Sequence, residues 1–291
     1  MPEEGIPKLS HKDILSVEEI EAIAKAFVNL GINKIRLTGG EPLVRGGILD
    51  IVEKIGNLDG VKDFAITTNG VLLKKYAQEL KNRGLKRVNI SLDTLKEEKY
   101  KYITRIGNIK DVFEGIEAAK KVGLTPIKIN TVLVKGFNDD EIEDLARLTE
   151  KEDIDVRFIE LMPIGETAKD ESSKFISSEV VLEKLPELIQ VERKDPSSPA
   201  VYYKLPNAKG KIGLIKPISC KFCRYCNRVR LTAQGKMKLC LHSNDEIDLK
   251  EPLRKGQDIE SVILEAVKRK PASHHLEDGK YVLKKMYQIG G

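Results

Sequence analysis

Short apolar runs and longer stretches with one apolar side alternate along residues 17–162 of the sequence. The short runs are rich in β-branched residues and predict buried strands, whereas the longer stretches predict amphipathic helices. The predicted strands span residues 34–38, 63–67, 87–92, 127–134 and 154–161, and the predicted helices span 18–30, 49–55, 71–83, 109–122 and 140–150. Gly31, Gly84 and Gly123 each end a helix just before a strand, as a left-handed C-terminal turn does. Repeated strand–helix units of this kind predict a parallel sheet or barrel.

The period stops near Pro163. Beyond it, the pattern predicts helices over residues 178–188 and 259–268 and β-like stretches over 200–204 and 211–216. We therefore expect a β/α barrel domain over residues 1–165 and a C-terminal domain over residues 166–291. Functional groups of parallel α/β folds lie at the carboxyl ends of the strands. One mouth should accordingly be ringed by residues 38–41, 67–70, 91–93, 128–130 and 157–162.

Charge is spread along the chain rather than concentrated. The 291 residues include 50 Lys plus Arg against 45 Asp plus Glu, for a formal net charge of +5. No single element gathers the Lys and Arg residues that a nucleic-acid-binding face needs. The sequence has no run of about 18 apolar residues and no charged-then-apolar leader of about 20 residues. We expect a cytoplasmic protein that binds neither nucleic acid nor membrane.

All 4 cysteines lie between residues 220 and 240. In a reducing compartment, such a group predicts metal ligation rather than disulfide bonds. Two residues separate Cys220 from Cys223 and Cys223 from Cys226, a spacing that lets paired sulfurs face one metal. A hairpin at Gly235 would return Cys240 to the same point.

Two kinds of metal fit this segment. A zinc ion would take all four cysteines, or three of them together with His242. A four-iron cluster on three cysteines would instead leave one iron open for a substrate. Arg230 stands where the ferredoxin spacing has its fourth cysteine, which disfavours an electron-transfer ferredoxin.

Arg228 and Arg230 alternate beside the cysteines along a predicted strand, so both guanidinium groups should lie on one face. A forked pair of donors suits a triphosphate or the anionic edge of a base. The plainer alternative is a pair of solvated surface arginines.

Six segments, in the same order along the chain, resemble one family. Residues 222–232 (FCRYCNRVRLT), with Cys240 and Leu241, resemble the C-terminal cluster motif of the GTP 3′,8-cyclase family. These are radical S-adenosylmethionine (SAM) enzymes that begin molybdenum cofactor biosynthesis. The other five segments are residues 36–45 (RLTGGEPLVR), 67–70 (TTNG), 89–93 (NISLD), 157–162 (RFIELM) and 289–291 (IGG).

The resemblance implies a role for each matching residue. Cys223, Cys226 and Cys240 would bind a second 4Fe-4S cluster whose open iron meets the guanine of GTP. The implied GTP-binding residues are Arg36, Thr67, Lys128, Arg228 and Arg230, the implied SAM-binding residues are Gly39, Gly40, Ser91 and Met162, and the implied catalytic residues are Arg228, Arg230, Gly290 and Gly291. In the family, a 5′-deoxyadenosyl radical from SAM removes hydrogen from C3′ of GTP, and the sugar radical attacks C8 of guanine.

The family's radical-forming 4Fe-4S cluster lies on a CxxxCxxC motif that Met-Pro-x-Glu-Gly directly follows. Residues 1–5 of this chain read MPEEG. The resemblance therefore implies an incomplete radical-SAM (β/α)6-type partial TIM barrel that lacks its first strand and these N-terminal cluster ligands. We expect a chain that, as written, does not cleave SAM.

Relatives in this family are homodimers, and cyclic pyranopterin monophosphate synthase acts downstream of them, so the resemblance implies both partners here. Two other functions stay open from the residues. One is a zinc-stapled protein that only sequesters a nucleotide. The other is a peptide-modifying radical SAM enzyme with an auxiliary cluster.

Overall fold

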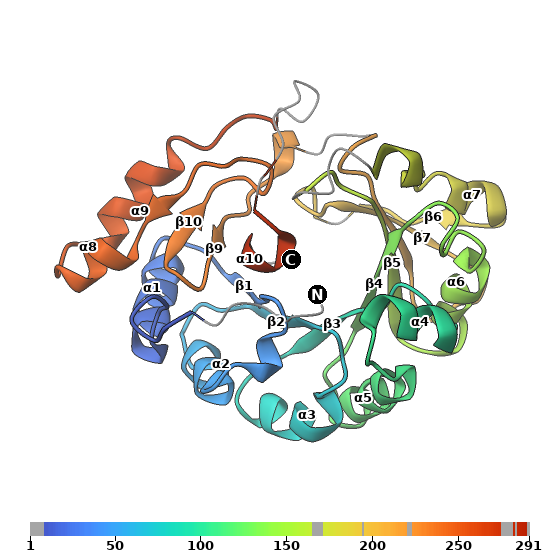
Figure 1. The fold of residues 1–291 in the computed structure, drawn as a ribbon, viewed down its shortest axis with the longest axis horizontal. Helices are drawn as coiled ribbons and strands as arrows, with labels where there is room; N and C mark the ends of the chain where they lie inside the picture. Colours follow the sequence, from blue (N-terminus) through green and yellow to red (C-terminus); the bar gives the residue numbers. More distant parts are fainter. Residues whose placement is uncertain are drawn as a thin grey trace.

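One open, curved sheet organises the chain (Figure 1). The structure is a computed structural model that describes residues 9–164, 171–193, 195–219, 223–274, 282 and 284–289. The sheet has eight strands in the order β1-β2-β3-β4-β5-β8-β7-β6. They are β1 Lys34–Leu37, β2 Asp63–Thr68, β3 Arg87–Ser91, β4 Ile127–Leu133, β5 Ile154–Glu160, β6 Ile189–Gln190, β7 Ala200–Lys204 and β8 Ile212–Ile215. β1 and β6 are its two edges, so the barrel is partial.

Helices cover the convex face of the arc (Figure 1). They are α1 Val17–Asn29, α2 Ile48–Gly56, α3 Leu73–Asn82, α4 Glu97–Thr104, α5 Ile109–Lys121 and α6 Ile142–Lys151. The five predicted strands and five predicted helices of this region are confirmed, with small differences at their ends. α4 was not predicted, because Tyr100 is its one buried side chain and gives no apolar periodicity. None of the helices in the described ranges is long and apolar enough to span a bilayer.

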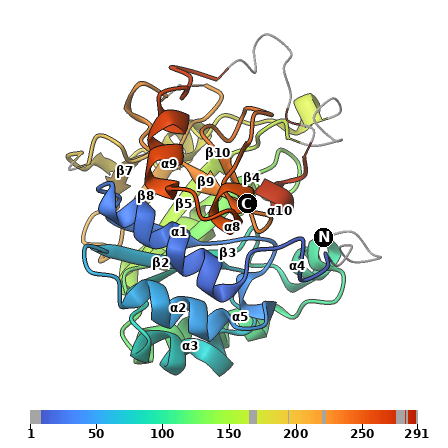
Figure 2. The same cartoon turned by 90° about the vertical axis from the view of Figure 1, so that its left-hand side faces the viewer.

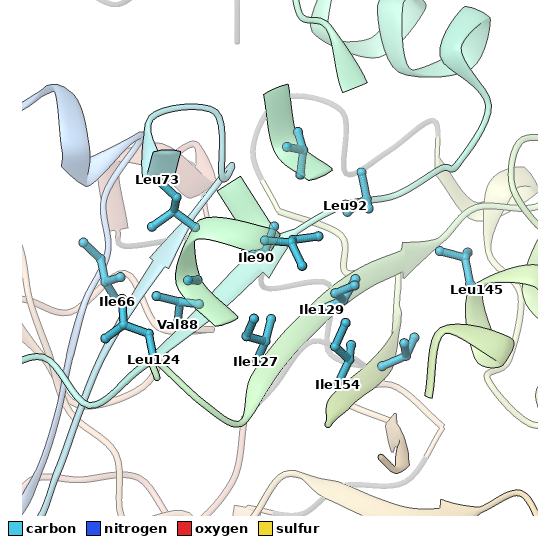
Figure 3. Packing of buried hydrophobic residues seen from close by; sticks show 14 of the residues in the cluster. Ile66, Leu73, Val88, Ile90, Leu92, Leu124, Ile127, Ile129, Leu145 and Ile154 are labelled. Atoms are coloured by element: carbon cyan, nitrogen blue, oxygen red, sulfur yellow. The ribbon is translucent and has the colours of Figure 1, made fainter. Parts of the chain in front are cut away.

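The main hydrophobic core lies between the sheet and these helices. Along β4, Ile127, Ile129 and Leu133 are buried, whereas Lys128 and Asn130 between them are only partly buried. Because successive side chains of a strand point to opposite faces, the polar set is left for the concave face. Figure 3 shows part of the apolar set, with labelled side chains that include Ile66, Leu73, Val88, Ile90 and Leu145.

One strand of the parallel sheet comes from beyond residue 165. β8 lies in a stretch predicted as β-like and pairs in parallel with β5, from Val156 opposite Ile212 to Ile159 opposite Ile215. β7, also predicted, pairs antiparallel with β8. The main sheet therefore continues past the expected boundary, and the division into two domains stays a prediction.

The helix predicted over residues 178–188 is shorter in the structure, where α7 spans Val180–Lys184. Leu185 and Pro186 follow it directly. A residue before proline avoids the helical conformation, so the helix ends there. The last predicted helix is confirmed as α9, Ile259–Val267.

A smaller unit packs against α1, and α9 lies beside α1 in both views (Figures 1 and 2). It contains β9 Arg230–Leu231, β10 Lys236–Lys238, β11 Ile247–Asp248, α8 Lys250–Arg254 and α9. Ile23 and Phe27 of α1 join its core, together with Met237 and Ile263. Ala24, on the same helix, joins the core of the main sheet instead. α1 therefore holds the small unit next to the β1 edge.

Replacing Ile23 by alanine tests this role of α1. The side chain is fully buried, and truncating such a residue lowers the free energy of unfolding by about 2–5 kcal/mol. Denaturant titration followed by circular dichroism measures the change. The control Lys25→Ala, at an exposed position of the same helix, should stay within about 0.5 kcal/mol of the parent. Equal losses for the two variants would contradict the assignment.

Candidate nucleotide and iron-sulfur site

Five arginines from distant parts of the chain lie close together at the concave face. Desolvation is the largest effect on Arg36 and lowers its pKa to about 9, aided by the positive charges of Arg157, Arg230, Arg87 and Arg228. The Arg36 side chain is nonetheless open to the concave space. In the described ranges, no acidic side chain forms an ion pair with it. Such a concentration of like charge favours an anionic ligand.

Asn89 of β3 connects two of these arginines through its uncharged side-chain amide. This fully buried side chain accepts from Arg157 Nη2 at 2.9 Å and from Arg87 Nη1 at 3.0 Å through Oδ1. Its Nδ2 donates to Thr67 Oγ1 at 3.2 Å. The amide orientation is the one that satisfies all three partners. Asn89 therefore fixes where the guanidinium groups and the Thr67 hydroxyl lie.

Lys128 lies on β4, the strand next to β3, directly opposite Asn89. Its Nζ lies 3.5 Å from Asp155 Oδ2 and 3.5 Å from the Tyr202 hydroxyl, and 5.6 Å from the centre of the Tyr202 ring. Asp155 therefore partly balances the charge of Lys128 at the wall of the mouth.

The turn after β1 carries Gly39 and Gly40, and Glu41 ties it to the end of β2. Glu41 Oε1 accepts from the Thr68 hydroxyl at 2.7 Å, and Oε2 accepts from Asn69 N at 2.7 Å. A Cβ built on Gly39 would meet nothing within 4 Å. The backbone of the turn is therefore held firmly while one side of it stays open.

Ser91 and Met162 lie at the ends of two other strands of the mouth. Ser91 is the exposed last residue of β3. Met162 follows β5 and packs against a small apolar cluster of Ile164, Val282 and Ile289. Ile289 belongs to α10 Met286–Ile289, which enters the concave side of the arc (Figure 1). The C-terminal segment therefore reaches the same mouth.

Glu160, the last residue of β5, anchors the chain that leads into the cysteines. The carboxylate is fully buried. Oε2 accepts from Ile218 N at 3.2 Å and Ser219 N at 3.0 Å, and Oε1 accepts from the Ser219 hydroxyl and from Ser178 N at 3.3 Å. One carboxylate thus fixes the start of the cysteine segment to the wall of the barrel.

The hairpin predicted at Gly235 is confirmed. β9 and β10 pair antiparallel, with Lys238 opposite Arg230, and Gly235 has a φ of 78°, which favours glycine. Cys223, Cys226 and Cys240 are free thiols of intermediate burial. Cys220 lies outside the described residues.

Cys226 lies in a positively charged setting. Desolvation acts to raise its pKa, but hydrogen bonds from the backbone and side chain of Arg228 and the charges of Arg228 and Lys270 outweigh that effect. The pKa of Cys226 therefore lies below its ordinary value. Since the thiolate is the form that binds metal, this setting favours ligation.

Cys240 lies near enough to the other two thiols for their charges to act on it. Desolvation is the largest effect on its pKa and raises it, and the charges of Cys223 and Cys226 act in the same direction. A backbone hydrogen bond from His242 and the charge of Lys270 act against them. The three sulfurs therefore share one region, and the cations around them suit an anionic iron-sulfur cluster. In the part of the chain that the structure describes, no three His, Cys, Asp or Glu side chains form a single-ion site.

His242, the alternative zinc ligand, packs against His274 with ring centroids 4.8 Å apart. Desolvation, followed by the charges of His274 and Arg230, lowers the pKa of His242 to about 4. Its ring is therefore neutral at pH 7. Its Nδ1 is buried and has no hydrogen-bond partner among the described residues.

Comparison with known proteins bears on the whole chain. The family model for the radical SAM superfamily matches residues 3–149, and that for Molybdenum Cofactor Synthesis C matches residues 154–276. A GTP 3′,8-cyclase of Peptoclostridium acidaminophilum is 58% identical over 292 residues, which cover 100% of this chain and 90% of that one. The chain belongs to the GTP 3′,8-cyclase family. A second relative of that name, from Alkaliphilus oremlandii, is 52% identical and is covered to 92%.

Membership of the GTP 3′,8-cyclase family confirms the resemblance drawn from the six motifs, and with it the radical SAM fold class. Radical SAM proteins use a 4Fe-4S cluster and SAM. A solved radical SAM methyltransferase from Sphaerobacter thermophilus matches 57% of this chain and 51% of its own, at 18% identity and a TM-score of 0.45. That likeness is too low to support an argument.

The structure brings most of the predicted site residues to one mouth, although their roles within the GTP 3′,8-cyclase family stay predictions. Arg36, Arg228 and Arg230 lie near one another, and Thr67 and Lys128 flank Asn89. Gly290 and Gly291 lie outside the described residues. No individual roles were predicted for Arg87, Asn89, Arg157, Tyr202 and Lys270. Arg87, Asn89, Arg157 and Tyr202 are polar residues on strands, and this pattern could have pointed to them. No local pattern marks Lys270.

Replacing Glu160 by glutamine tests the anchor of the cysteine segment. The amide offers one acceptor oxygen, and its NH2 group would face donors. Since a hydrogen bond to a charged group is worth about 1.5–3 kcal/mol, we expect the free energy of unfolding to fall by about 2–3 kcal/mol. Glu179→Gln, which affects an exposed ion pair with Lys216, should change it by less than about 1 kcal/mol. Denaturant titration compares the two, and equal stability would refute the anchor.

The carboxyl group of Asp93 makes the free energy of unfolding depend on pH. Desolvation raises the pKa of its carboxyl to about 6, against a hydrogen bond from Val132 N. The folded state therefore holds this proton more tightly than the unfolded state, so the contribution of Asp93 to stability is fully present below pH 4 and is lost as the pH rises through 6. Asp93→Asn removes the ionisation and keeps an oxygen for Val132 N. The melting temperature of the parent relative to this variant should fall between pH 4 and pH 7, and parallel curves would exclude Asp93 as the source.

Proposed function

We propose that this chain binds GTP in the concave mouth and supplies the nucleotide site and the C-terminal cluster site for its conversion to (8S)-3′,8-cyclo-7,8-dihydroguanosine 5′-triphosphate, the first step of molybdenum cofactor biosynthesis. The radical-forming cluster would need a CxxxCxxC motif, which these 291 residues do not contain. The observation that carries the proposal is the group of five arginines beside three half-buried thiols. Arg230 joins the two halves of the site, because the charges of Cys226 and Cys240 act on its guanidinium group.

The arginines account for the triphosphate. GTP carries about four negative charges on its phosphates, and guanidinium groups bind phosphate oxygens through paired N–H donors. Arg36, Arg228 and Arg230 would hold these oxygens, with Lys128 and the Thr67 hydroxyl at the wall. Binding would replace mutual repulsion by attraction, which gives the affinity a physical source.

Cys223, Cys226 and Cys240 would hold a 4Fe-4S cluster. When bound, that cluster offers an open iron to the purine, and SAM supplies the radical chemistry of the family. The residues of the chain would orient the ribose and exclude water. Arg228 and Arg230 keep the nucleotide beside the thiols, and Gly39, Gly40, Ser91 and Met162 would bind SAM across the mouth.

The remaining features of the proposal rest on the family. The tail residues Gly290 and Gly291 would reach the reacting nucleotide, as the direction of α10 toward the mouth supports. We further propose a cytoplasmic homodimer whose product passes to cyclic pyranopterin monophosphate synthase.

Anaerobic reconstitution with iron and sulfide tests the cluster. We expect about four irons per chain, an electron paramagnetic resonance signal after reduction, and GTP affinity that rises on iron loading. Serine at Cys223, Cys226 and Cys240 together should abolish the iron and the rise in affinity. Tightly bound zinc, or GTP affinity that is indifferent to iron, would favour a zinc-stapled nucleotide-binding protein instead.

Arg36→Ala tests the triphosphate site. Loss of a charged donor to phosphate costs about 1.5–3 kcal/mol, so the dissociation constant for GTP should rise roughly 10-fold to 150-fold. Isothermal titration calorimetry measures it, and guanosine should bind the parent and variant alike. Arg147→Ala, which removes an exposed ion pair with Glu150, is the matched control. Unchanged GTP affinity in Arg36→Ala would remove Arg36 from the site.

A further inference from the structure

Lys270 follows α9 and reaches the two backbone segments that carry Cys226 and Cys240. Its Nζ donates to Arg228 O at 2.8 Å and also to Leu239 O. Arg228 lies two residues after Cys226, and Leu239 directly precedes Cys240. One ammonium group therefore joins the two backbone segments whose spacing decides where these two sulfurs lie.

The support behind Lys270 is rigid. Its own backbone N donates to Val267 O at 3.0 Å, which continues the C-terminal turn of α9. Ile263 and Ala266 of α9 are buried in the core that also contains Met237 and Leu239 of the hairpin. The helix and the hairpin thus share one core, and this core supports Lys270 beside the segments of Cys226 and Cys240.

The charge of Lys270 acts on the same two thiols. Its Nζ contacts the backbone two residues after Cys226 and directly before Cys240, which places the positive charge near both sulfurs. Arg228 and Arg230 also lie there, but the proposed function assigns both of them to the triphosphate. Lys270 instead donates to two backbone carbonyls, so the contacts that hold it beside the thiols do not involve a nucleotide.

We propose that Lys270 is the positioning cation of the C-terminal iron-sulfur site. It holds the segments of Cys226 and Cys240 at the spacing that the cluster needs and offsets the negative charge of the bound cluster. The inference rests on the proposed function, since it takes iron-sulfur as the group on the three thiols. Two consequences follow. Metal should leave faster without Lys270, and the reduced cluster, which carries one more negative charge, should be harder to form.

The test compares Lys270→Met, which keeps the length of the side chain without its charge, with the conservative Lys270→Arg. Lys250→Met is the matched control. Lys250 Nζ also donates to a backbone carbonyl, but this is the carbonyl of Asp13, at 2.9 Å, and not one beside Cys226 or Cys240. Each reconstituted protein is given a ferrous chelator, and iron release is followed by absorbance. We expect release at least fivefold faster in Lys270→Met, and within twofold of the parent in Lys270→Arg and Lys250→Met.

Redox titration followed by electron paramagnetic resonance supplies the second readout. The midpoint potential should shift to more negative values in Lys270→Met alone. Circular dichroism melts identify a variant that fails to fold, in which case Lys270→Gln replaces it. Release rates and potentials equal to those of Lys250→Met would overturn the role of Lys270. A parent that takes up zinc and no iron would overturn the proposed function instead, and release of that zinc to a chelator would then decide whether Lys270 holds the thiol segments.

Discussion

Repulsion among the arginines of the concave face is the constraint that the rest of the architecture has to withstand. Arg36, Arg157 and Arg230 are brought together although desolvation lowers the pKa of each of them. The parallel ladder and the apolar core on the convex face hold their backbones in place. Asp63 forms an ion pair with Arg87, whereas Asn89 accepts from Arg87 and Arg157 without adding a negative charge. The mouth is thereby preorganised for a polyanion before any ligand arrives.

The second requirement is that two separate units share one mouth. α1 meets it with two buried sides, because Ala24 packs on the main sheet while Ile23 and Phe27 pack on the small unit. Glu160 supplies a polar link on the opposite side of the mouth, from β5 to residues 218 and 219. The cysteine segment is thus fixed at both ends, by packing near α1 and by a carboxylate at β5.

The parts of the fold that the sequence predicted are those with strong periodicity. Ile127, Ile129 and Leu133 mark β4 and its buried face, and similar patterns define the other strands and helices of residues 17–162. α4 escaped because Tyr100 is its single buried side chain, and the helix after Ser178 ended early at Pro186. The placement of β8 beside β5 depends on long-range pairing, which no local pattern records.

Some residues of the candidate site could likewise be predicted from the sequence, whereas others depend on long-range contacts. Spacing pointed to the group of four cysteines, and the family resemblance then selected Cys223, Cys226 and Cys240. The hairpin predicted before Cys240 is confirmed. Family motifs pointed to Arg36, Lys128 and the arginines of the cysteine segment. Asn89 and Lys270 went unnoticed, since their importance comes from partners that are distant in sequence. A buried amide and a lysine after a helix are both ordinary until the tertiary contacts are known.

The late position of β8 in the sequence also sets an order of events during synthesis. β5 ends at Glu160, but its neighbour β8 begins only at Ile212, so a growing chain carries β5 as an unpaired edge until that strand emerges. Bare edges invite association with other nascent chains. The cysteine segment leaves the ribosome directly after β8, when the parallel wall has just become able to close. The thiols of that segment therefore emerge only after every strand of the parallel wall has been made.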